Sequence, residues 1–247
     1  MYRPLVSIMM NCYNGEKYLH EALKSILNQT YENWELIFFD NCSTDKSKKI
    51  FKSFSDKRLK YYLSKDHTML GAARKRCYEK TNGELIAVLD TDDIWYPNKL
   101  ENQITIFKDH KVGIVISNFY YFNNLKRKKI IKKIPPEGFV FNHLLKNYYV
   151  QLSTLIFRKS VAEKLDKQFD HEFDFISDFD LVLRLSKITK LKYCDRVLSG
   201  WRVHGSNDTF KSPYNFVEET KRWITKYRKT NLFYSCEKEL LIFERKN

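Results

Sequence analysis

The apolar run Leu85-Ile86-Ala87-Val88-Leu89 leads directly into the acidic stretch Asp90-Thr91-Asp92-Asp93. Five consecutive apolar residues are typical of a strand that is buried on both faces of a parallel sheet. The acids therefore follow the C-terminal end of a strand, which is the edge of an open α/β sheet where ligands bind. Closely spaced carboxylates repel one another unless a cation lies between them, and oxygen ligands suit Mg²⁺ or Mn²⁺. The alternative is a solvated turn in which Asp93 or Asn98 caps the next helix.

Apolar strands and amphipathic helices alternate through the first 117 residues. This alternation predicts an α/β fold with a doubly wound, mostly parallel, Rossmann-like sheet that carries helices on both faces. Asp40, like the acidic stretch, follows an apolar strand. Gly71-Ala72-Ala73-Arg74 opens a helix whose free N–H groups and guanidinium suit a phosphate. The expected strands are 5–10, 34–39, 59–63, 85–89 and 112–117, and the expected helices are 16–28, 48–54, one from residue 71, and 97–110.

The second half of the chain is less regular. We expect a hairpin of 118–122 with 130–134 around the basic block 126–133, a helix at 139–147 and a strand at 153–158. A helix beginning near Ser177 places Asp178 in its first turn, and two short strands are expected at 192–197 and 199–204. The predicted organisation is a regular half at 1–117 of the kind that binds nucleotides, a less regular half of the same domain at 118–210, and a basic, aromatic, helical extension at 211–247.

Composition limits the class of protein. The 247 residues are 43% hydrophobic, which suffices for a globular core, and no apolar run is long enough to span a membrane. The N-terminus shows no signal-peptide pattern, so we expect a cytoplasmic protein. Its five cysteines are widely spaced and are expected to be free thiols. The net charge of +14 favours an anionic partner such as a nucleotide, an anionic lipid surface or a nucleic acid.

Taken together, these motifs follow one another in an order that resembles the inverting family 2 glycosyltransferases, which have the GT-A fold. The resemblance covers roughly residues 4 to 208. It is carried by Val6-Ser7-Ile8 with Tyr13-Asn14, Ser25-Ile26-Leu27-Asn28-Gln29-Thr30-Tyr31, Asp40-Asn41-Cys42-Ser43-Thr44-Asp45, Gly71-Ala72-Ala73-Arg74, Gly83-Glu84 with Asp90-Thr91-Asp92-Asp93-Ile94-Trp95, Asp178-Phe179-Asp180-Leu181, and Arg202-Val203-His204.

The resemblance implies that 1–117 is the nucleotide-sugar-binding half, which holds a donor site, and that 118–210 is the acceptor-binding and catalytic-base half of the same domain. Asp40 matches the acid that hydrogen-bonds the nucleobase, and Tyr13 and Asn14 would wall that pocket. Asp90 and Asp92 match the Asp-x-Asp motif, which handles the ribose and a cation, Mn²⁺ or Mg²⁺, that bridges the diphosphate.

The resemblance also implies the remaining site residues. Asp178 matches the general base, with Asp180 as a fallback because Ser177 stands where the family often has Glu. Arg74 and Arg202 would lie near the diphosphate, and the implied metal ligands are Asp92, Asp93 and His204.

The implied function is a metal-dependent, non-processive, inverting glycosyltransferase of the hexosyltransferase type. It would move one sugar from a nucleotide-diphosphate sugar, with UDP as the expected nucleotide, to a glycan or lipid-linked acceptor in surface polysaccharide synthesis. Glu219-Thr220-Lys221-Arg222-Trp223 only approximates the signature of processive members. The basic, aromatic tail from Lys211 to Asn247 either packs as helices or attaches to the anionic inner face of the cell membrane.

Two other functions fit parts of the sequence. A sugar-nucleotide-forming nucleotidyltransferase would carry a Gly-rich loop after the first strand, where residues 11–15 have one glycine. A nucleic-acid-binding module would suit the charge, yet acids cluster at the expected ligand edge, so no nucleic acid partner is expected.

Overall fold

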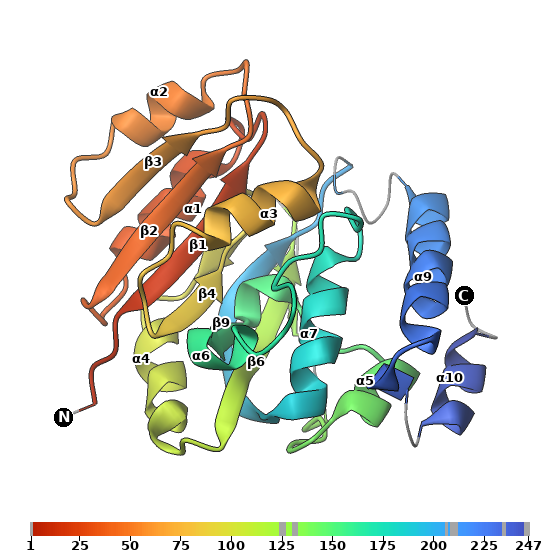
Figure 1. The fold of residues 1–247 in the computed structure, drawn as a ribbon. Coiled ribbons are helices and arrows are strands. Elements are labelled where there is room, and N and C mark those ends of the chain that lie inside the picture. Colours follow the sequence, from red (N-terminus) through yellow and green to blue (C-terminus); the bar gives the residue numbers. More distant parts are fainter. Residues whose placement is uncertain are drawn as a thin grey trace.

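The fold is built on one twisted sheet of nine strands (Figure 1). The computed structural model describes residues 2–123, 127–129, 133–205, 207, 212–233 and 236–244. The strand order is β3-β2-β1-β4-β8-β6-β9-β5, and β7 pairs with β6 outside this path. The strands are β1 (Val6–Cys12), β2 (Trp34–Asp40), β3 (Leu59–Leu63), β4 (Leu85–Val88), β5 (Ile94–Trp95), β6 (Val112–Phe122), β7 (Arg127–Lys129), β8 (Ile156–Arg158) and β9 (Lys190–Arg202).

Helices cover both faces of this sheet because the strand side chains alternate between two cores. Ile8 and Met10 face a core that includes residues of α1, α2 and α4, whereas Met9 faces a core that includes residues of α3, α5, α6, α7, α9 and α10. The doubly wound α/β fold is therefore confirmed. The helices are α1 (Leu19–Leu27), α2 (Ser47–Lys52), α3 (Leu70–Tyr78), α4 (Lys99–Ile104), α5 (Phe141–Lys146), α6 (Lys159–Ala162), α7 (Ser177–Ile188), α9 (Pro213–Arg228) and α10 (Glu237–Glu244), with 3-10 turns η1 (Thr105–Lys108), η2 (Leu152–Thr154) and η3 (Asn231–Phe233).

The sheet is mixed: its first four strands are parallel, as predicted, whereas β8, β5 and β7 pair antiparallel with their neighbours. β3, β2, β1 and β4 run parallel, and so do β6 and β9. β8 is reversed, because it pairs antiparallel with both β4 and β6. β6 crosses the expected boundary at residue 117, so the two halves of the domain share one continuous sheet.

Two local expectations differ from the structure. The two short strands expected at 192–197 and 199–204 are one long strand, β9, whose pairing with β6 shifts register near Ser117 and Asn118. These shifts let the strand bend without ending, and bulged positions leave no clear mark in a sequence. The strand that pairs with β6 in the expected hairpin is β7 at Arg127–Lys129, and residues 130–132 of the expected 130–134 lie outside the described residues.

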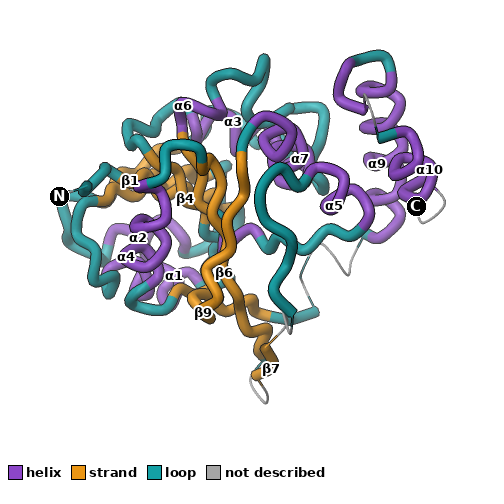
Figure 2. The backbone as a smooth tube through the Cα atoms, turned by 90° about the horizontal axis from the view of Figure 1, so that it is seen from below, coloured by secondary structure: helices purple, strands orange, loops and turns teal. Residues whose placement is uncertain are grey.

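The C-terminal extension packs against the domain as helices. Figure 2 shows α9 and α10 together beside α5 and α7, at the end of the molecule away from the N-terminus. Trp223, Phe233 and Phe243 belong to the same core as α7 and the sheet, and Trp223 is completely buried. In the part of the chain that the structure describes, no helix has the length and apolarity needed to cross a bilayer.

Candidate active site

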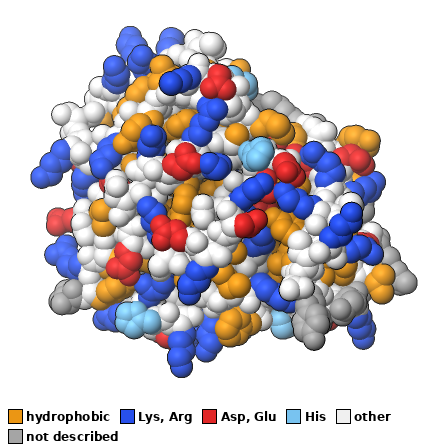
Figure 3. Space-filling view, viewed as in Figure 1, with side chains coloured by type: hydrophobic (Ala, Val, Ile, Leu, Met, Phe, Trp, Pro, Cys, Tyr) orange, Lys and Arg blue, Asp and Glu red, His pale blue; other side chains and the backbone are white. Residues whose placement is uncertain are grey.

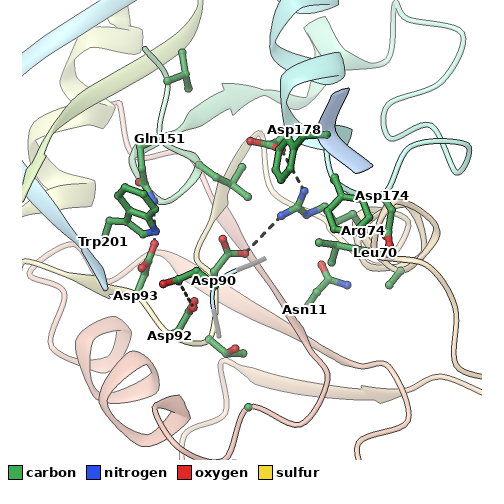
Figure 4. A pocket seen from close by; sticks show the side chains of 18 of the residues that line it. Asn11, Leu70, Arg74, Asp90, Asp92, Asp93, Gln151, Asp174, Asp178 and Trp201 are labelled. Atoms are coloured by element: carbon green, nitrogen blue, oxygen red, sulfur yellow. Dashed lines mark hydrogen bonds and ion pairs between the residues drawn. The ribbon is translucent and has the colours of Figure 1, made fainter. Parts of the chain in front are cut away.

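A large cavity of about 1730 Å³ opens at the C-terminal edge of the parallel strands (Figure 4). Its lining includes the acidic loop after β4, the end of β1, and the starts of α3 and α7. The predicted residues that line it are Tyr13, Asn14, Arg74, Asp90, Asp92, Asp93, Asp178 and His204. The structure therefore brings together residues that are separated by more than half the chain, at the edge where the sheet pattern predicts a ligand.

The three acids after β4 have three different environments. Asp90 is the most exposed, with 39% of its side chain accessible, and it lies 3.7 Å from an Arg74 nitrogen. Asp92 Oδ2 lies 2.9 Å from His204 Nε2. Asp93 is buried, with 1% exposed. The side chains of Asp90 and Asp92 are thus accessible from the cavity, whereas the side chain of Asp93 is buried.

Asp93 acts as a buried anchor of the loop. Its Oδ2 accepts hydrogen bonds from Gln151 Nε2 at 2.9 Å and Ser153 Oγ at 2.5 Å, and its Oδ1 accepts from the Arg202 backbone N–H at 2.9 Å. Burial raises the pKa of Asp93 well above its usual value, and the negative charges of Asp92 and Asp90 add to this shift. Both carboxylate oxygens already have protein donors, so in this conformation Asp93 holds the loop and offers no open oxygen to a cation.

Arg74 joins the acidic loop to the helix that carries Asp178. Its guanidinium is buried and donates from Nη1 to Ser177 Oγ at 2.6 Å, while Nη1 also lies 3.6 Å from Asp178 Oδ1. Because Nη2 faces Asp90, one side chain contacts both carboxylates, as the dashed lines of Figure 4 show. A planar guanidinium with several fixed donors is suited to this bridging position.

The start of α7 is held in place by the C-terminal extension. The Glu219 carboxylate, on α9, accepts hydrogen bonds from the backbone N–H groups of Asp174, Phe175 and Ile176 at 2.8–3.2 Å. These groups precede the helix and have no partner within it. Glu219 therefore fixes the turn from which Asp178 projects.

Asp180 does not face the cavity. Its carboxylate is fully buried, where it accepts hydrogen bonds from Arg184 and from Trp223 Nε1, the latter at 2.9 Å. It ties α7 to α9, whereas Asp178 lines the cavity with 24% of its side chain exposed. Of the two candidates for the general base, the geometry favours Asp178.

The residues expected to form the nucleobase pocket have other contacts than the resemblance implies. Asp40 is buried, and its oxygens accept from the Ser43 backbone N–H at 2.7 Å and from the Tyr61 hydroxyl at 2.6 Å. Asn14, with a φ of 54°, accepts from the Thr44 backbone N–H through its side chain. Both residues shape the loop after β2. Tyr13 is 53% exposed and packs against His67, with ring centroids 4.1 Å apart and the planes tilted by 35°, so these two rings form an open aromatic wall.

Arg202 supports the acidic loop from behind. Its Nε donates to the Asp92 backbone oxygen at 2.8 Å and its Nη2 to Glu21 at 2.6 Å. The guanidinium also lies over the Tyr18 ring, 4.5 Å from the centroid. The structure therefore places Arg202 beside the loop and outside the cavity lining, whereas Arg74 lines the cavity.

The cavity could hold a divalent cation only if other ligands, such as phosphate oxygens or water, completed its coordination. Within the described residues, no three His, Cys, Asp or Glu side chains are grouped as a complete metal site. Asp92 and His204 supply an oxygen and a nitrogen 2.9 Å apart, and the Asp90 carboxylate borders the same space. Carboxylate and imidazole together fit Mn²⁺, and Mg²⁺ commonly takes one or two carboxylates with phosphate oxygens and water. The residues present therefore fit a cation that arrives with a diphosphate.

Several residues of the site were not identified from the sequence. Glu219 contacts a turn 45 residues earlier in the chain, and no local pattern signals such a contact. His67 lies in a polar loop without a motif. Tyr148 and Gln151 line the cavity from the segment between α5 and η2, in which no motif indicates a functional residue.

Comparison with known proteins shows similarity to glycosyltransferases in both the family model and the relatives. The model of the family described as Glycosyl transferase family 2 matches residues 7–166. Escherichia coli WfgD, named UDP-Glc:alpha-D-GlcNAc-diphosphoundecaprenol beta-1,3-glucosyltransferase, is 30% identical over 219 residues, or 89% of this chain and 84% of WfgD.

Solved structures share the fold at low identity. S. aureus TarS in complex with UDP superposes with a TM-score of 0.76 and 20% identity, covering 96% of this chain and 69% of the other. The mannosyltransferase PcManGT from Pyrobaculum calidifontis, solved with GDP-Man and Mn²⁺, gives 0.71 and 16% identity, covering 99% and 74%.

Proposed function

The chain belongs to glycosyl transferase family 2, and on this basis we propose that it transfers one sugar from a UDP-sugar to a hydroxyl of a glycan or lipid-linked acceptor, with inversion at the anomeric carbon. The observation that carries this proposal is the row Asp90, Arg74 and Asp178, in which one guanidinium links the acidic loop to the first turn of α7. Both carboxylates border the cavity, and a carboxylate within hydrogen-bond reach of an attacking hydroxyl can act as its general base. Because the chain belongs to a glycosyltransferase family, the nucleotidyltransferase and nucleic-acid-binding alternatives are set aside.

On the donor side, we assign the nucleobase to the wall formed by Tyr13 and His67, next to the loop that Asp40 and Asn14 hold. Asp90 and Asp92 would face the ribose and diphosphate, with Arg74 donating to phosphate oxygens. Asp92 and His204 would hold Mn²⁺ or Mg²⁺, which neutralises charge on the departing nucleoside diphosphate as a Lewis acid. Asp93 and Arg202 contribute by fixing the acidic loop.

On the acceptor side, Asp178 would accept the proton of the attacking hydroxyl. The hydroxyl oxygen forms a bond to C1 of the donor sugar while the bond from C1 to the diphosphate breaks, and the electron pair leaves with the diphosphate. Attack on the face opposite to the leaving group inverts the configuration. Arg74 and Ser177 determine where the Asp178 carboxylate lies, so they position the base.

The cellular setting is proposed on two grounds. WfgD, by its name, acts on a diphosphoundecaprenol-linked sugar, which is a lipid-linked acceptor. A net charge of +14 would draw this chain to the anionic inner face of a cell membrane. Figure 3 shows lysine and arginine side chains dispersed among acidic ones on the face it draws, so such attraction would be spread over the surface. We therefore propose a cytoplasmic enzyme that associates peripherally with that membrane during surface polysaccharide synthesis.

A thermal-shift panel tests the proposed donor. We would heat the protein with UDP, GDP, UDP-glucose, UDP-N-acetylglucosamine and GDP-mannose, each with and without Mn²⁺. A ligand at 100 times its Kd stabilises the native state by about 2.7 kcal/mol, which is readily measured as a rise in Tm. We expect UDP and a UDP-sugar to raise the Tm, and more so with Mn²⁺. Absence of any nucleotide effect would refute the proposed function.

A further inference from the structure

Two polar side-chain atoms without a partner among the described residues belong to one short segment, 148–151, whose residues line the cavity. The Tyr148 hydroxyl and Gln151 Oε1 are both buried and have no hydrogen-bond partner among the described residues. Both residues line the cavity. A buried polar atom without a partner costs about 1–3 kcal/mol, and native structures rarely keep such atoms unless a ligand or water completes them.

Tyr148 lies next to the base. Its ring packs on Phe179, the residue after Asp178, with centroids 5.0 Å apart. Burial raises the pKa of the Tyr148 hydroxyl well above its usual value, Asp178 adds to this shift, and Arg74 opposes it. The hydroxyl therefore stays protonated and available to donate a hydrogen bond close to Asp178.

Gln151 lies at the other end of the same segment and is fixed in orientation. Its Nε2 donates to Asp93 Oδ2 at 2.9 Å, and its buried Oε1 accepts no hydrogen bond from the described residues. Figure 4 shows Gln151 beside Trp201 and Asp93. The segment from Tyr148 to Gln151 thus runs from the base to the acidic loop.

The attacking hydroxyl must reach Asp178, so the acceptor must lie against this segment. Binding cavities commonly combine apolar and aromatic walls with a few polar groups that fix the ligand's orientation. Here Trp201 and Phe216 line the cavity together with Tyr148 and Gln151. A donor and an acceptor, both neutral, match a sugar ring that carries several hydroxyls better than they match a phosphate or a simple alcohol.

We propose that the Tyr148 hydroxyl and Gln151 Oε1 form the subsite that orients the acceptor, and that this acceptor presents a neutral, polyhydroxylated sugar ring. Tyr148 donates to an oxygen of the ring or its substituents, and Gln151 accepts from a hydroxyl that does not react. This inference rests on the proposed glycosyl transfer, because it takes Asp178 as the base.

The test uses Tyr148→Phe, with Tyr78→Phe as its matched control. Tyr78 also has a buried hydroxyl without a partner among the described residues, but it lies on α3 outside the cavity lining. Both variants remove only an oxygen that makes no hydrogen bond to a described residue, so both are expected to fold with an unchanged or slightly higher Tm. The probes are the methyl glycosides of glucose, galactose and N-acetylglucosamine, measured by saturation-transfer NMR in the presence of UDP, and UDP itself.

We expect the wild type to bind at least one methyl glycoside, and Tyr148→Phe to weaken that binding about tenfold while its affinity for UDP is unchanged. Tyr78→Phe should match the wild type for both ligands. Equal glycoside affinity in Tyr148→Phe and the wild type would overturn the subsite, and so would a wild type that binds UDP but none of the glycosides. A wild type that fails to bind UDP would instead overturn the proposed function, and this inference with it.

Discussion

Arg74 Nη1 lies 3.6 Å from Asp178 Oδ1, and this contact joins the start of α3 to the start of α7. The other terminal nitrogen of the same guanidinium faces Asp90, so one side chain holds the carboxylates of the acidic loop and of α7. A change in the position of Arg74 would therefore affect both carboxylates, which we propose face the donor and the acceptor.

Arg74→Lys tests this link. An ammonium is a single point charge and cannot contact Asp90, Ser177 and Asp178 together, so we expect kcat/KM to fall about 10–100-fold with the fold retained. Arg76→Lys, on the same helix, is the matched control because Arg76 pairs with Asp66 at the surface. Steady-state kinetics and circular dichroism give the two readouts. Similar losses in both variants would contradict a specific role for Arg74.

Asp178→Asn tests the general base. The change preserves shape and removes the proton acceptor, so transfer should fall about 10²–10⁴-fold while the affinity for UDP stays nearly constant. Asp180→Asn should behave in the opposite way, because it leaves the buried Arg184 without its carboxylate partner and lowers the free energy of unfolding by about 3 kcal/mol. Single-turnover kinetics and urea denaturation separate these effects. A catalytic loss confined to Asp180→Asn would move the base to Asp180.

The proposed metal dependence centres on Asp92. We expect EDTA to abolish transfer and Mn²⁺ or Mg²⁺ to restore it. Asp92→Asn should remove the additional rise in Tm that Mn²⁺ gives in the presence of UDP, since the carboxylate that faces His204 would be lost. Asp66→Asn is a surface control. Full transfer in the presence of chelator would show that Asp92 has another role.

Glu219 is expected to stabilise the chain and to position the base. Glu219→Ala leaves three backbone N–H groups before α7 without an acceptor, so the free energy of unfolding should fall by about 3 kcal/mol. We also expect kcat to fall while UDP affinity is kept, and Glu219→Gln to recover part of both losses. Glu218→Ala is the neighbouring control, because Glu218 only pairs with Lys221 at the surface. Unchanged kcat in Glu219→Ala would limit Glu219 to a structural role.

Membrane association should depend on charge. Trp223, Phe233 and Phe243 are buried, so these aromatic residues of the extension are not available to a bilayer. We expect the protein to sediment at low salt with vesicles that contain anionic lipid, and to be released from them at about 0.5 M NaCl. It should not sediment with neutral vesicles. Failure to sediment with anionic vesicles at low salt would refute the proposed location.

Local patterns predicted the first strands and the place of the acidic loop, because β1, β2 and β4 are short apolar runs and Asp40 and Asp90 each come at the end of one. The apolar run before Asp90 and the strand ending at Asp40 lie where the sequence places them. The position of Asp178 in the first turn of α7 is also confirmed, because the helical spacing of apolar residues in this segment predicts where the helix begins. These features depend only on residues within a few positions of one another.

The hydrogen-bond partners of the site residues could not be predicted from the sequence, because packing between distant segments determines them. Asp40 looks like a free acid after a strand, yet Tyr61, 21 residues later, occupies one of its oxygens. Asp93 looks like a third metal ligand, yet it is surrounded by Gln151, Ser153 and Arg202. No spacing rule distinguishes such an anchored acid from an exposed one.

The hydrogen bond from the Arg202 backbone to Asp93 spans 109 residues of chain. Ribosomes add about 5–20 residues per second, so the loop Asp90–Asp93 is made about 5–20 s before Arg202 is. During that interval the loop lacks both the N–H group that Asp93 accepts and the guanidinium that supports Asp92. We therefore expect the acidic loop to reach its final conformation late in synthesis, when β9 inserts between β6 and β5. A nascent chain that stalls before β9 is made should be inactive when it is released.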